Sequence, residues 1–188
     1  MQNRLLFRRI VISAFVLLFI SGCGHFRRKK PIPATTASTH ETPTRAFKKT
    51  TPKEDAAMFQ EIGLAYFQQK DLRASSIFLS KAVQLNPKLY LSWYCLGLLN
   101  VNSPQGYDYL KKAAQEKPEF PNPYYWMAYY HCRLGEDRKA ISLFKEYIKL
   151  AKGKFGEEER VRAAKEVLQE LESGKEGKFL TEIRKSAQ

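Results

Sequence analysis

The cysteines and histidines are the side chains with which this sequence could do chemistry. Cys23 ends the run Ile20-Ser21-Gly22-Cys23, directly after an apolar stretch. The others are scattered along the chain: His25, His40, Cys95, His131 and Cys132. The sequence holds no P-loop, HExxH or GxSxG motif and no pair of cysteines at zinc spacing. We therefore expect no enzyme activity, no cofactor and no metal, and we take the Cys23 thiol as the candidate for covalent modification.

The stretch before Cys23 predicts a cleaved leader. Three arginines precede the run from Ile10 to Ile20, which is apolar except for Ser13. As a helix these residues would rise roughly 16 Å, about half the thickness of a bilayer's hydrocarbon core. A run of this length after positive charge is typical of a secretory signal peptide, which we assign to residues 1–22.

The segment Ile20-Ser21-Gly22-Cys23 resembles the lipobox of bacterial lipoprotein signal peptides. In that family the thiol receives a diacylglyceryl group, and cleavage makes the cysteine the new N-terminus. The resemblance implies a covalent lipid on Cys23 and a place at a bacterial cell membrane. Gly24 is not the aspartate that retains some lipoproteins in the inner membrane, so the expected location is the outer membrane, facing the periplasm.

The alternative is an uncleaved signal anchor whose domain faces the cytoplasm. Four cations, Arg27 to Lys30, follow the apolar run, and positive charge beside such a run favours the cytoplasmic side.

Residues 23–50 read as a flexible basic tether. Residues 24–50 hold seven basic side chains and one acidic one, many threonines and prolines, and no apolar period. The cations would attract anionic lipid headgroups. The formal charge of the whole chain, +13, could suggest nucleic-acid binding, but residues 51–172 hold eighteen basic and sixteen acidic side chains. The tether also lacks interleaved aromatic residues for base stacking, so we predict membrane contact and no nucleic-acid partner.

Repeated intervals begin after the tether. Thr51 and Glu54 form a predicted capping box with proline at the first helical position. Gly63, Gly97 and Ala128 then follow one another at intervals of 34 and 31 residues. Such intervals predict pairs of helices that stack on one another.

Aligned on these intervals, the chain resembles the tetratricopeptide repeat, a helix–turn–helix unit of 34 residues. Family positions are occupied in the three copies by Phe59, Ile62, Gly63 and Tyr66, by Trp93, Leu96 and Gly97, and by Tyr124, Met127 and Ala128. The resemblance implies an all-α fold, an α-solenoid of about three repeats over residues 51–152. The copies span about 56–89, 90–120 and 121–152.

A further helix is predicted over residues 156–172. Val161, Ala164, Leu168 and Leu171 form one apolar stripe at helical spacing, and such a terminal helix closes the last apolar surface of a repeat stack. For residues 173–188 we expect a mobile tail with one helical turn near Phe179 and Ile183.

In this family the first helices of successive repeats line a groove that holds an extended peptide or a partner helix. The resemblance places the lining here at Gln60, Leu64, Phe67, Leu91, Tyr94, Leu98, Val101, Tyr125, Tyr129 and Arg133. Tyrosines suit a binding surface because they offer contact area together with a polar group. Some of these residues could instead pack against the terminal helix or the tail.

These features predict a non-catalytic adaptor that binds a segment of another envelope protein. Proteins of this build serve in the assembly of outer-membrane, secretion, pilus or cell-wall machinery. The alternative from another class is a cell-wall-binding accessory subunit of an envelope enzyme.

Overall fold

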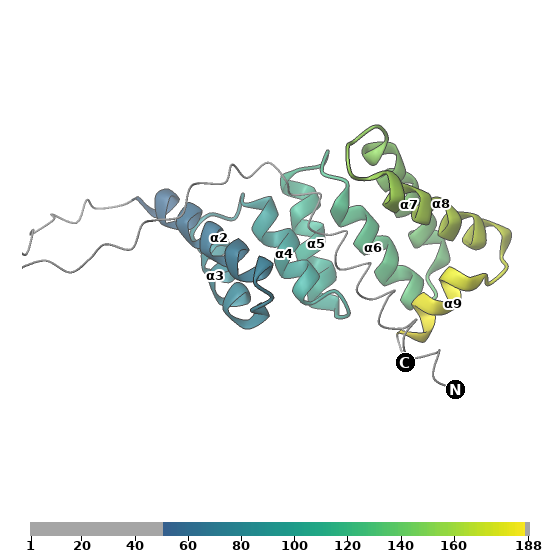
Figure 1. Cartoon of the computed structure of the whole chain (residues 1–188), viewed down its shortest axis with the longest axis horizontal. Coiled ribbons are helices and arrows are strands. Elements are labelled where there is room, and N and C mark those ends of the chain that lie inside the picture. The colour runs from purple at the N-terminus through teal and green to yellow at the C-terminus, as the bar shows by residue number, and fades with distance from the viewer. Residues whose placement is uncertain (1–50, 187–188) are drawn as a thin grey trace, which may run out of the picture. The chain divides into compact units, whose positions relative to one another are not determined.

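Residues 51–186 fold into the helices α2 to α9, joined by turns, and this part of the chain contains no strand (Figure 1). The computed structural model describes these residues. The predicted leader, Cys23 and the tether lie outside the described range, as do residues 187–188. The helices are α2 (Pro52–Gln68), α3 (Leu72–Leu85), α4 (Tyr90–Leu99), α5 (Pro104–Glu116), α6 (Asn122–Arg133), α7 (Asp137–Ala151), α8 (Glu158–Ser173) and α9 (Lys178–Lys185). The prediction of an all-α fold is confirmed.

Within residues 51–186, no helix combines the length and the apolar character that crossing a bilayer would require.

The capping box at the start of α2 is present. The backbone N–H of Glu54 donates to Thr51 Oγ1 at 3.2 Å, and the Thr51 N–H donates to Glu54 Oε2 at 2.8 Å. Two N–H groups that the helix itself cannot satisfy therefore find acceptors. Pro52 occupies the first turn, where its missing N–H costs nothing.

The first six of these helices form three pairs, α2 with α3, α4 with α5, and α6 with α7 (Figure 1). Successive pairs contact each other through α3 and α4 and through α5 and α6. A Cβ atom at Gly63 would lie 2.7 Å from Leu79 Cγ, and one at Gly97 would lie 2.6 Å from Leu110 Cγ. Each glycine thus receives a leucine of the second helix, which explains why a residue without a side chain recurs after 34 positions.

Helix α8 covers the last pair and packs against α7. It lies where the apolar stripe predicts a closing helix. Phe144 and Tyr147 of α7 are buried together with Ala164, Val167 and Leu171 of α8. These side chains form the hydrophobic core at the C-terminal end of the stack.

The segment after α8 differs from the predicted mobile tail with one helical turn. It folds as the eight-residue helix α9, which contacts α6 and α8 (Figure 1). Gly174 ends α8 in the left-handed conformation, at φ 65°, so that the chain can turn back. Leu180 and Ile183 then face the core, and Leu180 is only 2% exposed. Tertiary packing stabilises a helix that is too short to be stable alone.

Candidate partner-binding face

The ten residues predicted to line a groove lie on α2, on α4 and the turn after it, and on α6; we call them the first-helix face. Eight of them are half-buried. Tyr94 and Tyr125 are buried, with 4% and 6% of their surface exposed. The expectation that these two tyrosines offer their rings to a partner is therefore wrong.

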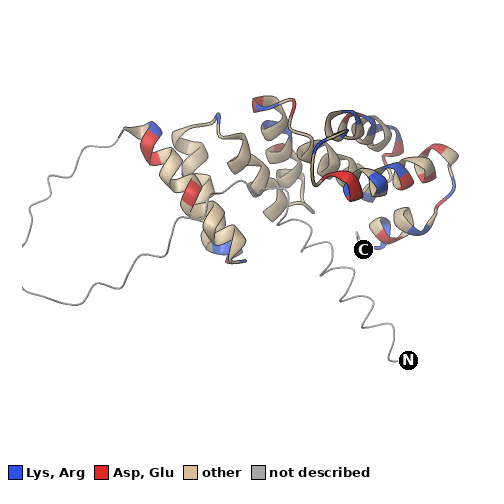
Figure 2. Ribbon diagram, turned by 45° about the horizontal axis from the view of Figure 1, so that its top comes forward, with Lys and Arg blue, Asp and Glu red and all other residues tan. Residues whose placement is uncertain are grey.

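The part of the face on α2 and α4 presents apolar side chains without charge. It consists of Gln60, Leu64, Phe67, Leu91, Leu98 and Val101, all half-buried. Residues 89–107 include no charged side chain, and in Figure 2 the ribbon of α4 is therefore tan, without blue or red. Ser92 Oγ donates to Gln60 Oε1 at 2.9 Å and joins the two helices. This arrangement suits contact with an apolar segment better than recognition of a charged group.

The two buried tyrosines belong to the cores between helices. The Tyr94 ring meets Phe120 edge to face, with ring centroids 5.1 Å apart. The Tyr125 ring meets Phe144 and Tyr147 of α7 at 5.7 and 5.2 Å. Burial raises the pKa of Tyr125 to about 12. Both side chains thus stabilise the stack.

A buried polar network connects α6, α7 and α8 beside Tyr125. Tyr147 Oη donates to Glu157 Oε2 at 2.8 Å, and Arg160 Nη1 donates to the same oxygen at 2.7 Å. Arg160 also donates to Asn122 Oδ1 at 3.3 Å, and its guanidinium lies 6.0 Å from the centre of the Tyr125 ring. Burial, together with the bond to Glu157, raises the pKa of the Tyr147 hydroxyl. The network fixes α8 against the last helix pair.

The part of the face on α6 carries α9 at its end. Tyr129 Oη lies 3.1 Å from Ser186 Oγ, and Arg133 Nη2 donates to the carbonyl oxygen of Ser186 at 3.3 Å. Arg133 Nη1 donates to Asn102 Oδ1 at 2.6 Å. Tyr129 and Arg133 thus contact the C-terminal segment, which is the alternative that the sequence analysis left open.

One residue of this face was missed by the sequence analysis. Cys132 follows Tyr124 by eight positions, as Phe67 follows Phe59 and Val101 follows Trp93. The helical offset therefore assigns the equivalent place to Cys132 rather than to its neighbour Arg133. Cys132 is fully buried, in one core with Leu180 of α9. Burial raises the pKa of its thiol to about 12.

Solved structures share this arrangement of helix pairs. The TPR domain of Arabidopsis OM64 matches with a TM-score of 0.56 and 15% identity, over 64% of this chain and 98% of that one. SycD, the type III secretion translocator chaperone of Yersinia enterocolitica, matches with a TM-score of 0.60 and 12% identity, over 69% and 90%. PcrH, solved in complex with the chaperone binding region of PopD, matches with a TM-score of 0.58 and 16% identity, over 66% and 96%.

The fold is a tetratricopeptide-like α-solenoid. At these identities the likeness shows the fold alone. Neither a family model nor a curated protein matches the sequence.

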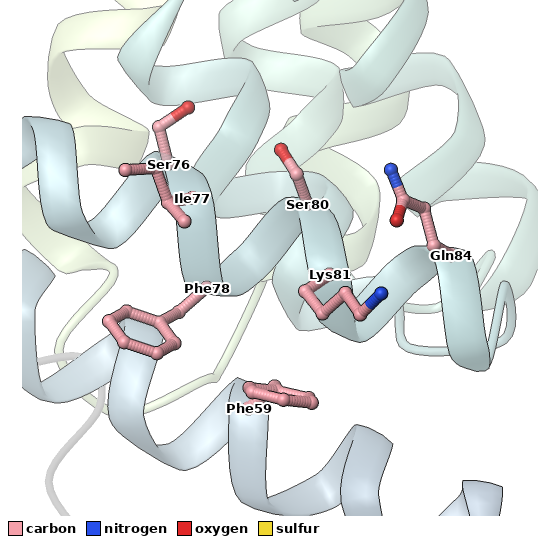
Figure 3. A pocket seen from close by; sticks show the side chains of 7 residues that line it. All are labelled: Phe59, Ser76, Ile77, Phe78, Ser80, Lys81 and Gln84. Carbon is pink, nitrogen blue, oxygen red and sulfur yellow. The ribbon is translucent and has the colours of Figure 1, made fainter.

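A hollow of ≈ 570 Å³ in the tetratricopeptide-like domain lies outside the first-helix face, on α2 and α3 (Figure 3). It is lined by Phe59, Ser76, Ile77, Phe78, Ser80, Lys81 and Gln84. This lining includes three aromatic or aliphatic side chains, two serine hydroxyls and the amine of Lys81. The hollow offers apolar contact from Phe59, Ile77 and Phe78.

The buried thiol and phenols predict a loss of stability in alkali. The pKa of Cys132 is raised from 9.0 to about 12 and that of Tyr125 from 10.0 to about 12, because both are buried as neutral groups. The unfolded chain releases these protons first, so the free energy of unfolding should fall as the pH rises from about 9 to 12. Each group contributes at most about 1.4 kcal/mol per pH unit. Urea unfolding at stepped pH measures the slope.

The Cys132→Ala variant is the control for this prediction. With the thiol absent, the decline should begin near the ordinary pKa of tyrosine, about one pH unit higher. Identical slopes for the two proteins between pH 9 and 10 would show that the thiol has no share in the effect.

Proposed function

We propose that this protein is a lipid-anchored adaptor of the bacterial cell envelope that binds a segment of another envelope protein on its first-helix face. Cys23 would carry the lipid, and the basic tether behind it would hold the domain near anionic headgroups. The expected location is the outer membrane, facing the periplasm. The adaptor would be non-catalytic, and its partner would be an extended peptide or a helix.

The observation that carries this proposal is the uncharged, half-buried row on α2 and α4. Leu64, Leu98 and Val101 offer apolar surface on two successive first helices, without a cation or carboxylate between residues 89 and 107. PcrH, which shares this fold, was solved in complex with the chaperone binding region of PopD, and this complex supports the proposal of a partner segment here. An apolar segment would gain most by covering such a row, because burial of apolar surface drives association.

The experiment begins with a photo-crosslinking amino acid at Phe67 in living cells, to identify the protein bound to the face. Binding of that protein, once purified, is then measured with the Leu98→Asp variant. We expect at least a roughly tenfold loss of affinity, since a charge replaces an apolar contact in the centre of the row.

Leu72→Asp is the matched control, because Leu72 lies on α3, outside the first-helix face, and is 54% exposed. It should bind the partner as the unchanged protein does. Equal binding by the Leu98→Asp variant would contradict the proposal. Crosslinks to cell-wall glycan instead of a protein would favour the accessory-subunit alternative.

A further inference from the structure

Helix α9 packs on the domain through contacts with α6 and α8. It is eight residues long and lies against α6 and α8 (Figure 1). Leu180 is 2% exposed and shares a core with Cys132 and Tyr125, and Ile183 packs against the same core. The helix thus covers the third-repeat end of the first-helix face, which we define as Tyr129, Cys132 and Arg133.

Polar groups of the domain hold both ends of α9. At its start, the Glu170 carboxylate accepts the N–H of Leu180 at 2.8 Å and that of Phe179 at 3.4 Å. A negative charge at this place also suits the helix dipole. At its end, Ser186 meets Tyr129 and Arg133, as described above. These contacts fix the direction in which the helix lies.

Arg184 is the cation of α9 that forms ion pairs with its surroundings. Its Nη2 donates to Asp137 Oδ1 at 2.6 Å, where α7 begins, and its Nη1 contacts Glu176. The side chains that meet the domain therefore stand at positions i, i+3 and i+4: Leu180, Ile183 and Arg184.

Helix α9 depends for its stability on these contacts with the rest of the domain. Isolated helices shorter than about 12 residues are marginal in water. α9 follows α8 through Gly174 and Gly177, so it is connected by a short segment that contains two glycines. Phe179, the third large apolar residue of α9, is 36% exposed, and Leu180 is the one residue of this helix that is buried. The helix can therefore leave without unfolding the helix pairs.

We propose that α9 is a displaceable intrachain ligand of the third-repeat end of the first-helix face. This end then accepts a partner helix that presents the same chemistry, a leucine and an isoleucine one turn apart followed by a cation for Asp137. The proposal rests on the proposed function in one respect, namely that a partner binds this face. The opening of α9 itself does not depend on any partner.

Cys132 reports whether α9 is in place. We would measure the rate of thiol alkylation at Cys132 and at Cys95 in the full-length protein by mass spectrometry of its peptides. In the unchanged protein both thiols are buried and should react slowly. The Leu180→Asp variant should react at Cys132 about 10- to 100-fold faster. This factor is the rise in the population of the open state that is expected when the burial of one leucine is lost.

Two features make the result specific. Lys185→Asp introduces the same charge on the same helix at an exposed position, and it should leave the rate at Cys132 within about twofold of the unchanged protein. Cys95 of α4 is 4% exposed and lies outside the core that contains Leu180. If the Leu180→Asp variant were simply unfolded, Cys95 would react as fast as Cys132, so acceleration confined to Cys132 supports the proposal.

Gly177→Val tests the same opening without changing a core residue. A Cβ atom at Gly177 would collide with the Glu170 carboxylate that caps α9. We expect a several-fold rise at Cys132 and none at Cys95. Unchanged Cys132 rates in both the Leu180→Asp and the Gly177→Val variants would overturn the proposal, because the thiol would then be covered by something other than α9.

The ligand chemistry is tested with a synthetic peptide of the sequence from Gly177 to Ser186, added to the Leu180→Asp variant. A short tether corresponds to an effective concentration of millimolar order, so peptide at about that concentration should slow alkylation of Cys132 at least about twofold. A peptide with aspartate at the Leu180 position should have no effect. Equal effects of the two peptides, or none of either, would contradict the assignment of a leucine-bearing helix as ligand. None of these measurements involves an envelope partner, so failure of the proposed function would leave them unaffected.

Discussion

The Cys23→Ala variant should lose its acyl label and keep its leader, because the proposed lipid is attached to this thiol and the proposed cleavage makes Cys23 the new N-terminus. Acyl chains are the expected anchor, and each buried methylene adds about 0.8 kcal/mol to membrane binding. One acyl chain gives only marginal attachment and two or more give a stable one. Without the lipid, the apolar leader and the basic tether are left to hold the protein, the tether in a salt-dependent manner. Metabolic labelling with a fatty acid, gel mobility and salt extraction of the membrane fraction measure the three consequences.

Cys95→Ala is the matched control, because it removes a thiol from α4 and leaves Cys23 in place. This variant should keep its label, its mobility and its membrane fraction. If Cys23→Ala changed none of the three, the lipoprotein assignment would be wrong. The uncleaved signal anchor, with its cluster of cations from Arg27 to Lys30, would then be the better account, and the partner would be sought in the cytoplasm.

The helix pairs could be predicted because their determinants are local and recur at fixed intervals. Gly63 and Gly97 each face a leucine of the following helix, and this requirement leaves a small residue in the sequence at every repeat. The capping box at Thr51 is likewise complete within four residues. Both signals can be recognised in the sequence without knowing which elements pack against the helix.

The first-helix face could be predicted only in part, because an offset along a helix tells which way a side chain points and not what covers it. Tyr94 and Tyr125 point in the expected direction, yet Phe120 and the α7 aromatic residues bury them. Cys132 is buried in one core with Leu180 of α9, and Ile183 packs against the same core. Three apolar residues in an eight-residue helix, Phe179, Leu180 and Ile183, give a pattern too short to separate from a frayed tail.

The Arg160→Met variant should lose about 3–5 kcal/mol of unfolding free energy, the usual cost of breaking a buried ion pair. The side chains of Arg160 and Glu157 are only 14% and 9% exposed, and their N–O distance is 2.7 Å. Methionine keeps most of the apolar stem of arginine but leaves the Glu157 carboxylate with the Tyr147 hydroxyl and without a cation. Since small domains are stable by about 5–15 kcal/mol, urea unfolding should show a large shift of the midpoint.

Arg162→Met is the matched control, two residues further along α8. Its side chain is 70% exposed and lies 4.0 Å from Glu159, so its loss should cost about 0.5 kcal/mol or less. Adding Glu157→Gln to Arg160→Met should restore part of the stability, because the uncompensated charge is then gone. Equal midpoints for the Arg160→Met and Arg162→Met variants would mean that the buried pair does not hold α8. In that case the aromatic and aliphatic contacts of Tyr147, Val167 and Leu171 would be sufficient to close the stack.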